Sequence, residues 1–145
     1  MIIFSLDVFK SFKTSLASIS LISISENDQT HPSISYNESL SEVMVCWEDY
    51  RSGSYYDIYC NSVNEDNLNV GEEIVVSDLS YNQRYPYVFS TLDGSYLITW
   101  QDSRNDPGVN LAPDDDIYIQ QISNGQFVFD NDGMVVCDED FNQTY

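Results

Sequence analysis

Short apolar runs separated by polar turn residues dominate the chain and predict an all-β fold. The runs 43–47 and 96–100 are apolar at nearly every position, and clusters of Gly, Asn, Asp and Ser flank them. Runs this short, bounded by turn residues and rich in β-branched and aromatic side chains, are typical of strands. Because they do not alternate with polar residues, we expect these inner strands to be buried on both faces.

The same reading divides the chain into two sets of four short strands. Turn signals such as Asp93-Gly94 and Asn124-Gly125 separate the strands, and connections this short favour antiparallel neighbours. The predicted strands cover residues 33–36, 42–47, 57–62 and 73–77 in the first set, and 87–90, 95–101, 116–122 and 133–137 in the second.

A repeated motif relates the two sets. Trp, Asp, Arg, Asp and Tyr occur in the same order in both, and a glutamine precedes each set at Gln29 and Gln83, with a third at Gln143. Four antiparallel strands in roughly 55 residues is the size of one propeller blade. The repeated positions are Trp47, Asp49, Arg51, Asp57 and Tyr59, then Trp100, Asp102, Arg104, Asp116 and Tyr118.

These residues carry a family resemblance. Pro86, Ser90, Asp93-Gly94, Arg104 and the run Asp116-Ile117-Tyr118 resemble the repeat of TolB-like propellers. The Trp-x-Asp-x-Arg … Asp-Ile-Tyr pattern is also similar to repeats of secreted and cell-surface β-propellers. The resemblance implies two four-stranded antiparallel propeller blades and an extracellular or cell-surface location. The first unit departs from it, with Ser39-Leu40-Ser41 in place of Asp-Gly.

The domain organisation follows from the repeats. Residues 1–20 form an N-terminal extension, and residues 21–145 hold the two repeats, at about 29–82 and 83–142. The extension contains both lysines, Lys10 and Lys13. We expect it to pack on the domain as a strand or short helix; the alternative is a cleaved secretion signal, although its lysines follow apolar residues instead of preceding them.

Two blades cannot close a ring, because propellers have about four to eight. We therefore expect a partial propeller that is completed by other subunits or by missing chain. Residues 21–25 look like the last strand of a preceding blade, and 143–145 like the start of a following one. That arrangement predicts a homo-oligomer formed head to tail, either a closed ring or an open filament.

The net charge restricts the partners. The chain has 24 acidic and 5 basic residues, a net charge of −19. Such a surface repels phosphate backbones and anionic lipid, which disfavours nucleic-acid and membrane-surface binding. No apolar run approaches the roughly 20 residues of a membrane span, so we expect no membrane insertion.

The repeated motif has a structural and a functional interpretation. In the structural one, the aspartate accepts backbone N–H groups of the turn and Arg51 pairs with Asp57 across the hairpin. In the functional one, each tryptophan stacks on a sugar ring, as in a lectin. Duplication favours the structural role, because a catalytic group need not be copied into each blade. We therefore expect a non-catalytic structural or interaction module that self-associates, with a carbohydrate-binding lectin and then a glycosidase-like enzyme as alternatives.

Other candidate sites are weaker. We expect no cofactor, with calcium at acidic loops as the alternative. Cys46 and Cys60 can form a cross-strand disulfide if the register aligns them, and the redox compartment stays open. Two glycosylation sequons begin at Asn37 and Asn142. The calcium candidates are Asp114, Asp115, Asp130 and Asp132.

Overall fold

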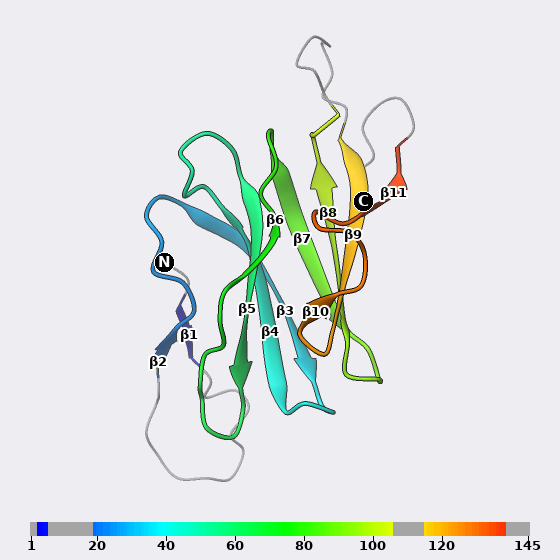
Figure 1. Ribbon diagram of the computed structural model, residues 1–145. Coiled ribbons are helices and arrows are strands. Elements are labelled where there is room, and N and C mark those ends of the chain that lie inside the picture. Colours follow the sequence, from blue (N-terminus) through cyan, green and yellow to red (C-terminus); the bar gives the residue numbers. More distant parts are fainter. Residues whose placement is uncertain (1–2, 6–18, 106–114, 139–145) are drawn as a thin grey trace.

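A computed structural model describes residues 3–5, 19–105 and 115–138, and these residues confirm the all-β prediction. They contain strands and turns and no helix. Strands β1 (Ile3–Ser5) and β2 (Ile19–Leu21) pair with each other, and the remaining strands form one four-stranded and one five-stranded antiparallel sheet (Figure 1). Between its two strands, the N-terminal extension lies outside the described residues.

The first sheet is a simple meander. Strands β3 (Gln29–Asn37), β4 (Glu42–Asp49), β5 (Asp57–Asn64) and β6 (Ile74–Ser77) are hydrogen-bonded in chain order. Short side chains build the turns between them: the carboxamide oxygen of Asn37 accepts the backbone N–H of Ser39. Such Asx turns return the chain at once, so neighbours in sequence become neighbours in the sheet.

The second sheet repeats this order with one added strand. Strands β7 (Gln83–Ser90), β8 (Tyr96–Asp102) and β9 (Asp116–Ser123) follow each other, and β11 (Met134–Cys137) pairs with one end of β9. The prediction of four strands was wrong here. Asn124 and Gly125 both have positive φ, the signature of a two-residue hairpin, and they fold β10 (Gln126–Phe127) back onto the other end of β9.

Both sheets begin with the same bulge. The register shifts between Thr30 and Ser33 in β3, and between Arg84 and Tyr87 in β7. A proline lies inside each bulge and cannot donate to the ladder, which confines it to an edge strand. The predicted strands started after these prolines and were too short; both strands continue through the bulge to the preceding glutamine.

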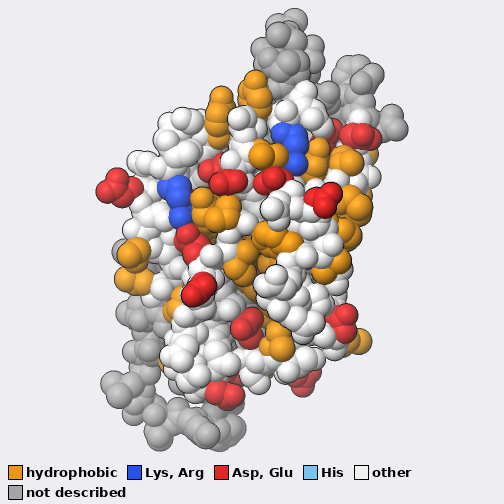
Figure 2. Space-filling view, in the orientation of Figure 1, with side chains coloured by type: hydrophobic (Ala, Val, Ile, Leu, Met, Phe, Trp, Pro, Cys, Tyr) orange, Lys and Arg blue, Asp and Glu red, His pale blue; other side chains and the backbone are white. Residues whose placement is uncertain are grey.

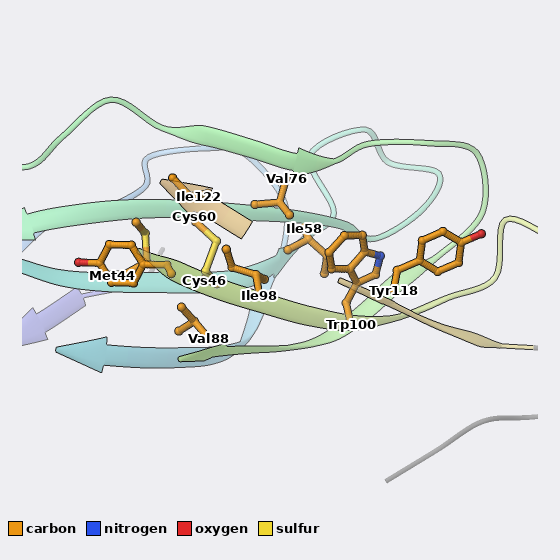
Figure 3. Close-up of a cluster of buried hydrophobic side chains, with 11 residues drawn as sticks. Met44, Cys46, Ile58, Cys60, Val76, Val88, Ile98, Trp100, Tyr118 and Ile122 are labelled. Carbon is orange, nitrogen blue, oxygen red and sulfur yellow. A yellow bond between two sulfur atoms is a disulfide. The ribbon is translucent and has the colours of Figure 1, made fainter. Parts of the chain in front are cut away.

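The two sheets stack face to face around one hydrophobic cluster. One face of β4 and β5 contributes Met44, Cys46, Ile58 and Cys60, and the facing side of the second sheet contributes residues that include Ile98 and Trp100 (Figure 3). Cys46 and Cys60 are direct cross-strand partners and form a disulfide with a Cα–Cα distance of 4.0 Å. The bond lies inside this cluster, where both cysteines are fully buried.

A second cluster covers the other face of the first sheet. It contains Val43, Val45, Trp47, Tyr59 and Val63, together with Ile22 from the N-terminal side. Ile22 is the repeat counterpart of Val76 in β6. Ile22 belongs to the cluster of Trp47, as Val76 belongs to the cluster of Trp100. The expected strand over 21–25 was nevertheless wrong beyond Leu21, because β2 ends there and pairs with β1.

The two sheets differ in how far their inner strands are buried. Every residue of β4 from Val43 to Asp49 is buried, as the sequence predicted. In β8 the prediction was wrong for Leu97 and Thr99, which are only partly covered. Their side of the second sheet faces away from the first sheet, so no sheet of the described chain packs over it. The second sheet therefore presents an open outer face.

Candidate functional site

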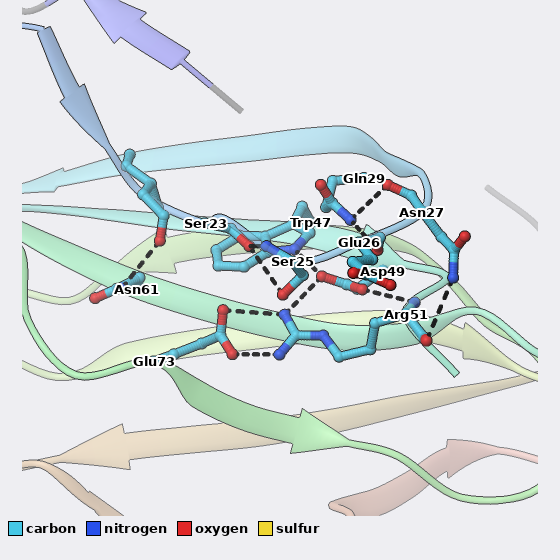
Figure 4. Close-up of polar contacts among 11 residues, drawn as sticks. Ser23, Ser25, Glu26, Asn27, Gln29, Trp47, Asp49, Arg51, Asn61 and Glu73 are labelled. Carbon is cyan, nitrogen blue, oxygen red and sulfur yellow. Dashed lines mark hydrogen bonds and ion pairs between the residues drawn. The ribbon is translucent and has the colours of Figure 1, made fainter. Parts of the chain in front are cut away.

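The repeated motif forms a clamp at the hairpin between the inner strands of each sheet. In the first sheet, the Trp47 indole N–H donates to Oδ2 of Asp49 at 2.9 Å, and the backbone N–H of Arg51 donates to Oδ1 at 2.8 Å (Figure 4). The Arg51 guanidinium donates to the same carboxylate at 2.7 Å and lies 3.7 Å from the centre of the Tyr59 ring. One buried carboxylate thus holds the strand end, the turn and the arginine.

The second sheet builds the same clamp with nearly the same distances. Trp100 donates to Asp102 at 2.8 Å, the backbone N–H of Arg104 donates at 2.9 Å, and its guanidinium donates at 2.5 Å. The guanidinium carbon lies 3.8 Å from the centre of the Tyr118 ring. Both aspartates are fully buried. The same contacts in both sheets indicate a structural role, because each copy satisfies the buried polar groups of its own hairpin.

The expected pairing of Arg51 with Asp57 was wrong. Arg51 instead bridges Asp49 and Glu73 of the segment before β6, with bonds of 2.5 and 3.0 Å to the two Glu73 oxygens. Hydrogen bonds from Arg51 and Trp47 outweigh the burial that opposes them and lower the pKa of Asp49. In the second sheet, Asp116 accepts a hydrogen bond from the side chain of Asn105 at 2.7 Å.

Asp57 therefore keeps a buried carboxyl group with an unusual environment. It is 5% exposed and lies opposite Asp49 in the register of β4 and β5. Burial is the main cause of its shift, and the charges of Asp78 and Asp49 add to it, so that the pKa of Asp57 rises to about 7 despite the attraction of Arg51. Desolvation and like charges both disfavour the ionised form.

The indole rings of the clamp cannot bind a sugar by stacking. Trp47 and Trp100 have no exposed surface, and each packs against the tyrosine of its own motif, with ring centres 6.4 and 6.1 Å apart. A stacked sugar needs an accessible ring face. The lectin interpretation therefore loses the two residues on which it depended.

A second polar cluster joins the two sheets at their bulges. The Glu48 carboxylate has no exposed surface and accepts the backbone N–H of Tyr85 at 2.7 Å. Arg84 donates to it at 3.3 Å, and the Nδ1 atom of His31 lies 3.0 Å from it. The hydroxyl of Thr30 also donates to it. The first sheet thus holds the bulge of the second through one buried carboxylate.

The sequence analysis missed this cluster. The signal lay in the departures from the repeat: Glu48 corresponds to Gln101, His31 to Tyr85, and Thr30 to Arg84. His31 is the only histidine, and Arg84 is the one arginine outside the repeated motif. A charged residue that replaces a neutral one in a repeat marks a contact that only one copy makes.

The candidate calcium ligands gain no support from the described residues. The described residues contain no group of three or more His, Cys, Asp or Glu placed to hold a metal ion. Asp114 lies outside the described residues, and the Asp115 carboxylate accepts the Ser103 hydroxyl. The backbone carbonyls of Asp130 and Asp132 accept bonds from Gln120 and Arg104.

The sequons have different outcomes. Asn37 is 1% exposed, and its amide nitrogen donates to the Ser95 carbonyl. A glycan therefore does not fit on this side chain in the folded protein. Asn142 lies outside the described residues.

A groove runs along one side of the molecule between the outer strands of the two sheets. Its volume is about 470 Å³, and Ile74, Val75, Ile122 and Phe127 give it an apolar floor. Figure 2 shows hydrophobic side chains gathered in the middle of the view, with acidic side chains scattered around them. Glu73, at its edge, is already bound to Arg51. Glu72 also lines the groove, which thus combines an apolar floor with acidic side chains at its edge.

Comparisons with known proteins give no match to a family model, to a curated protein or to a solved structure. Within the described residues, no helix is long and apolar enough to cross a membrane. The function of the chain therefore has to be argued from its geometry.

Proposed function

We propose that the chain is a non-catalytic interaction module, built from two propeller-type blades, that acts by self-association. The observation that carries the proposal is the asymmetry of the two sheets. Both faces of β4 are buried, whereas the outer face of the second sheet exposes Tyr87, Phe89 and Met134 by 59%, 56% and 47%. Contiguous apolar surface of this kind marks interaction sites in proteins.

The blade interpretation is supported by the order of the strands. Each sheet is built around a meander of four antiparallel strands, and the two sheets stack with opposite faces of the repeat in contact. The first sheet contributes Met44 and Cys46, whereas the second contributes Ile98 and Trp100, the counterparts of Val45 and Trp47. The clamp recurs with the same contacts in both sheets. A unit that stacks on its own repeat is the building principle of propellers and related arrays.

The non-catalytic interpretation is supported by the hydrogen bonds that the buried carboxylates accept from the fold itself. Asp49 accepts from three donors and Asp102 from four, and Glu48 is occupied by the bulge of the second sheet. Acid–base catalysis needs carboxyl groups that reach a substrate. The clamp carboxylates have no exposed surface and serve the fold.

The native mass tests this proposal. We expect sedimentation velocity across a range of micromolar concentrations to show a particle larger than one chain, with a folded near-UV spectrum. A folded chain that stays monomeric at every concentration would contradict self-association. Head-to-tail assembly into a ring or filament, as predicted from the sequence, would appear as particles larger than a dimer.

A further inference from the structure

We propose that the outer face of the second sheet pairs with the same face of a second copy about a two-fold axis. This inference rests on the proposed self-association and names its surface and symmetry. The face consists of two cross-strand rows of side chains. Its rows are Tyr87, Thr99, Ile119 and Met134, and Phe89, Leu97 and Gln121.

The face is suited to a copy of itself because its rows carry no acidic side chain. The whole chain has a net charge of −19, so two copies repel each other across most orientations. At position 101 a neutral glutamine stands where the first sheet has the buried Glu48. Gln101 is only 8% exposed, so this replacement leaves no acidic charge beneath the face. Arg84, at the edge of the face, is paired with Glu48.

The contact between the two sheets within the chain shows why a third sheet does not fit in the same manner. There, the Ser33 hydroxyl accepts the backbone N–H of Val88 at 3.0 Å, and Ser35 accepts that of Ser90 at 2.9 Å. The corresponding positions of the second sheet are Tyr87 and Phe89. These residues are bulkier than serine and have no hydroxyl group on Cβ, so an approaching strand does not find the same acceptors close to the backbone.

Head-to-tail stacking also has only a small second surface. It would place the outer face of the second sheet against the outer face of the first sheet of another copy. On that face Val43, Val45 and Trp47 are at most 3% exposed, and only the edge strand β3 exposes apolar side chains, with Ile34 at 48% and Tyr36 at 38%. A heterologous contact needs two different open faces, and an isologous contact needs only one. In the described chain, the outer face of the second sheet is open on both its inner and its edge strands, whereas that of the first is open only along β3, which favours the two-fold pair.

The first experiment removes the aromatic side chains of the face. The double variant Y87S/F89S introduces the residues that the first sheet has at these positions, and L92S, in a fully exposed turn outside the face, is the control. We expect dimers for the wild type and L92S, and a dissociation constant for Y87S/F89S raised by more than about thirtyfold. Added salt should tighten the wild-type dimer by screening the repulsion between copies. Thermal melts establish that each variant is folded.

The second experiment tests the symmetry. Thr99 lies in the middle of the face between Tyr87 and Ile119, so T99C in a C137S background should cross-link to its own copy through a short bismaleimide. An assembly that survives Y87S/F89S, or that gives no T99C–T99C product, would overturn the two-fold pair and leave the proposed function standing. A folded monomer under all conditions would overturn both.

Discussion

Glu48 and Tyr85 connect the two sheets through a hydrogen bond from a backbone N–H to a buried carboxylate. The Glu48 carboxylate has no exposed surface, and it accepts the backbone N–H of Tyr85 at 2.7 Å inside the bulge of β7. Tyr85 has a φ of 55°, a conformation that is uncommon for a residue with a bulky side chain. The contact therefore satisfies an N–H group that the bulge removes from the ladder, and it fixes the second sheet relative to the first.

Replacement of Glu48 by alanine should destabilise the protein strongly. The variant leaves the Tyr85 N–H and the Arg84 guanidinium without their shared acceptor, which costs about 3 kcal/mol in the free energy of unfolding. E48Q keeps an acceptor and should lose only about half as much. Urea unfolding measures both.

Gln101 provides the matched control for Glu48. It occupies the same repeat position and is also buried, but it carries no charge. We expect Q101A to cost less than about 1 kcal/mol under the same conditions, at concentrations where all variants have the same mass. Equal losses for E48A and Q101A would show that Glu48 does not join the sheets.

The raised pKa of Asp57 predicts a stability that falls as the pH rises. Burial and the charges of Asp78 and Asp49 raise the pKa of Asp57 from 3.8 to about 7. Between these values the folded protein binds a proton that the unfolded chain releases, so the free energy of unfolding decreases with pH and stays low above pH 7. D57N is neutral throughout and should be more stable than the wild type at about pH 8, by roughly 2 kcal/mol.

Asp66 controls for the general effect of charge. It is exposed, and D66N changes the net charge by the same amount as D57N. We expect D66N to follow the pH dependence of the wild type in thermal melts from acid to alkaline pH, while D57N gives a flatter curve. Parallel curves for D57N and the wild type would refute the assigned environment of Asp57.

The disulfide should contribute through the short loop that it closes. Cys46 and Cys60 are 14 residues apart in sequence, so C46A/C60A should lower the free energy of unfolding by about 3 kcal/mol. C137A removes the free cysteine, which lies partly exposed in β11, and should change stability by less than about 0.5 kcal/mol. Urea unfolding without reductant compares the two; a similar loss in both variants would mean that the cross-link does not stabilise the fold.

Gly133 is required by packing as well as by backbone conformation. It has a φ of 80°, and a Cβ atom would lie 2.5 Å from the Trp100 ring and 2.8 Å from the Ile119 carbonyl oxygen. G133A should therefore cost about 2 to 4 kcal/mol. Gly53 also has positive φ but an open surrounding, so G53A should cost only about 1 kcal/mol. If both variants lose the same amount in thermal melts, the backbone over Trp100 is not tightly packed.

Local features of the sequence predicted the strands and their order. Apolar runs bounded by Asn, Asp, Gly and Ser placed the cores of β4, β5, β8 and β9 close to their observed positions, because strand formation and tight turns depend on neighbouring residues. The duplicated Trp-x-Asp-x-Arg motif also predicted that Asp49 accepts a turn N–H, since both groups lie within three residues.

Contacts between distant residues were decided only by the tertiary structure. The partner of Arg51 is Glu73 because β6 returns beside β5, and nothing in the hairpin itself distinguishes Glu73 from Asp57. The role of Glu48 appears only once the bulge of β7 is packed against it. By itself the sequence determined two equivalent sheets, because the same pattern occurs twice. The tertiary structure made them unequal. Stacking of the second sheet buried one face of β4, and the cluster that includes Ile22 buried the other, whereas no sheet of the described chain covers the outer face of β8.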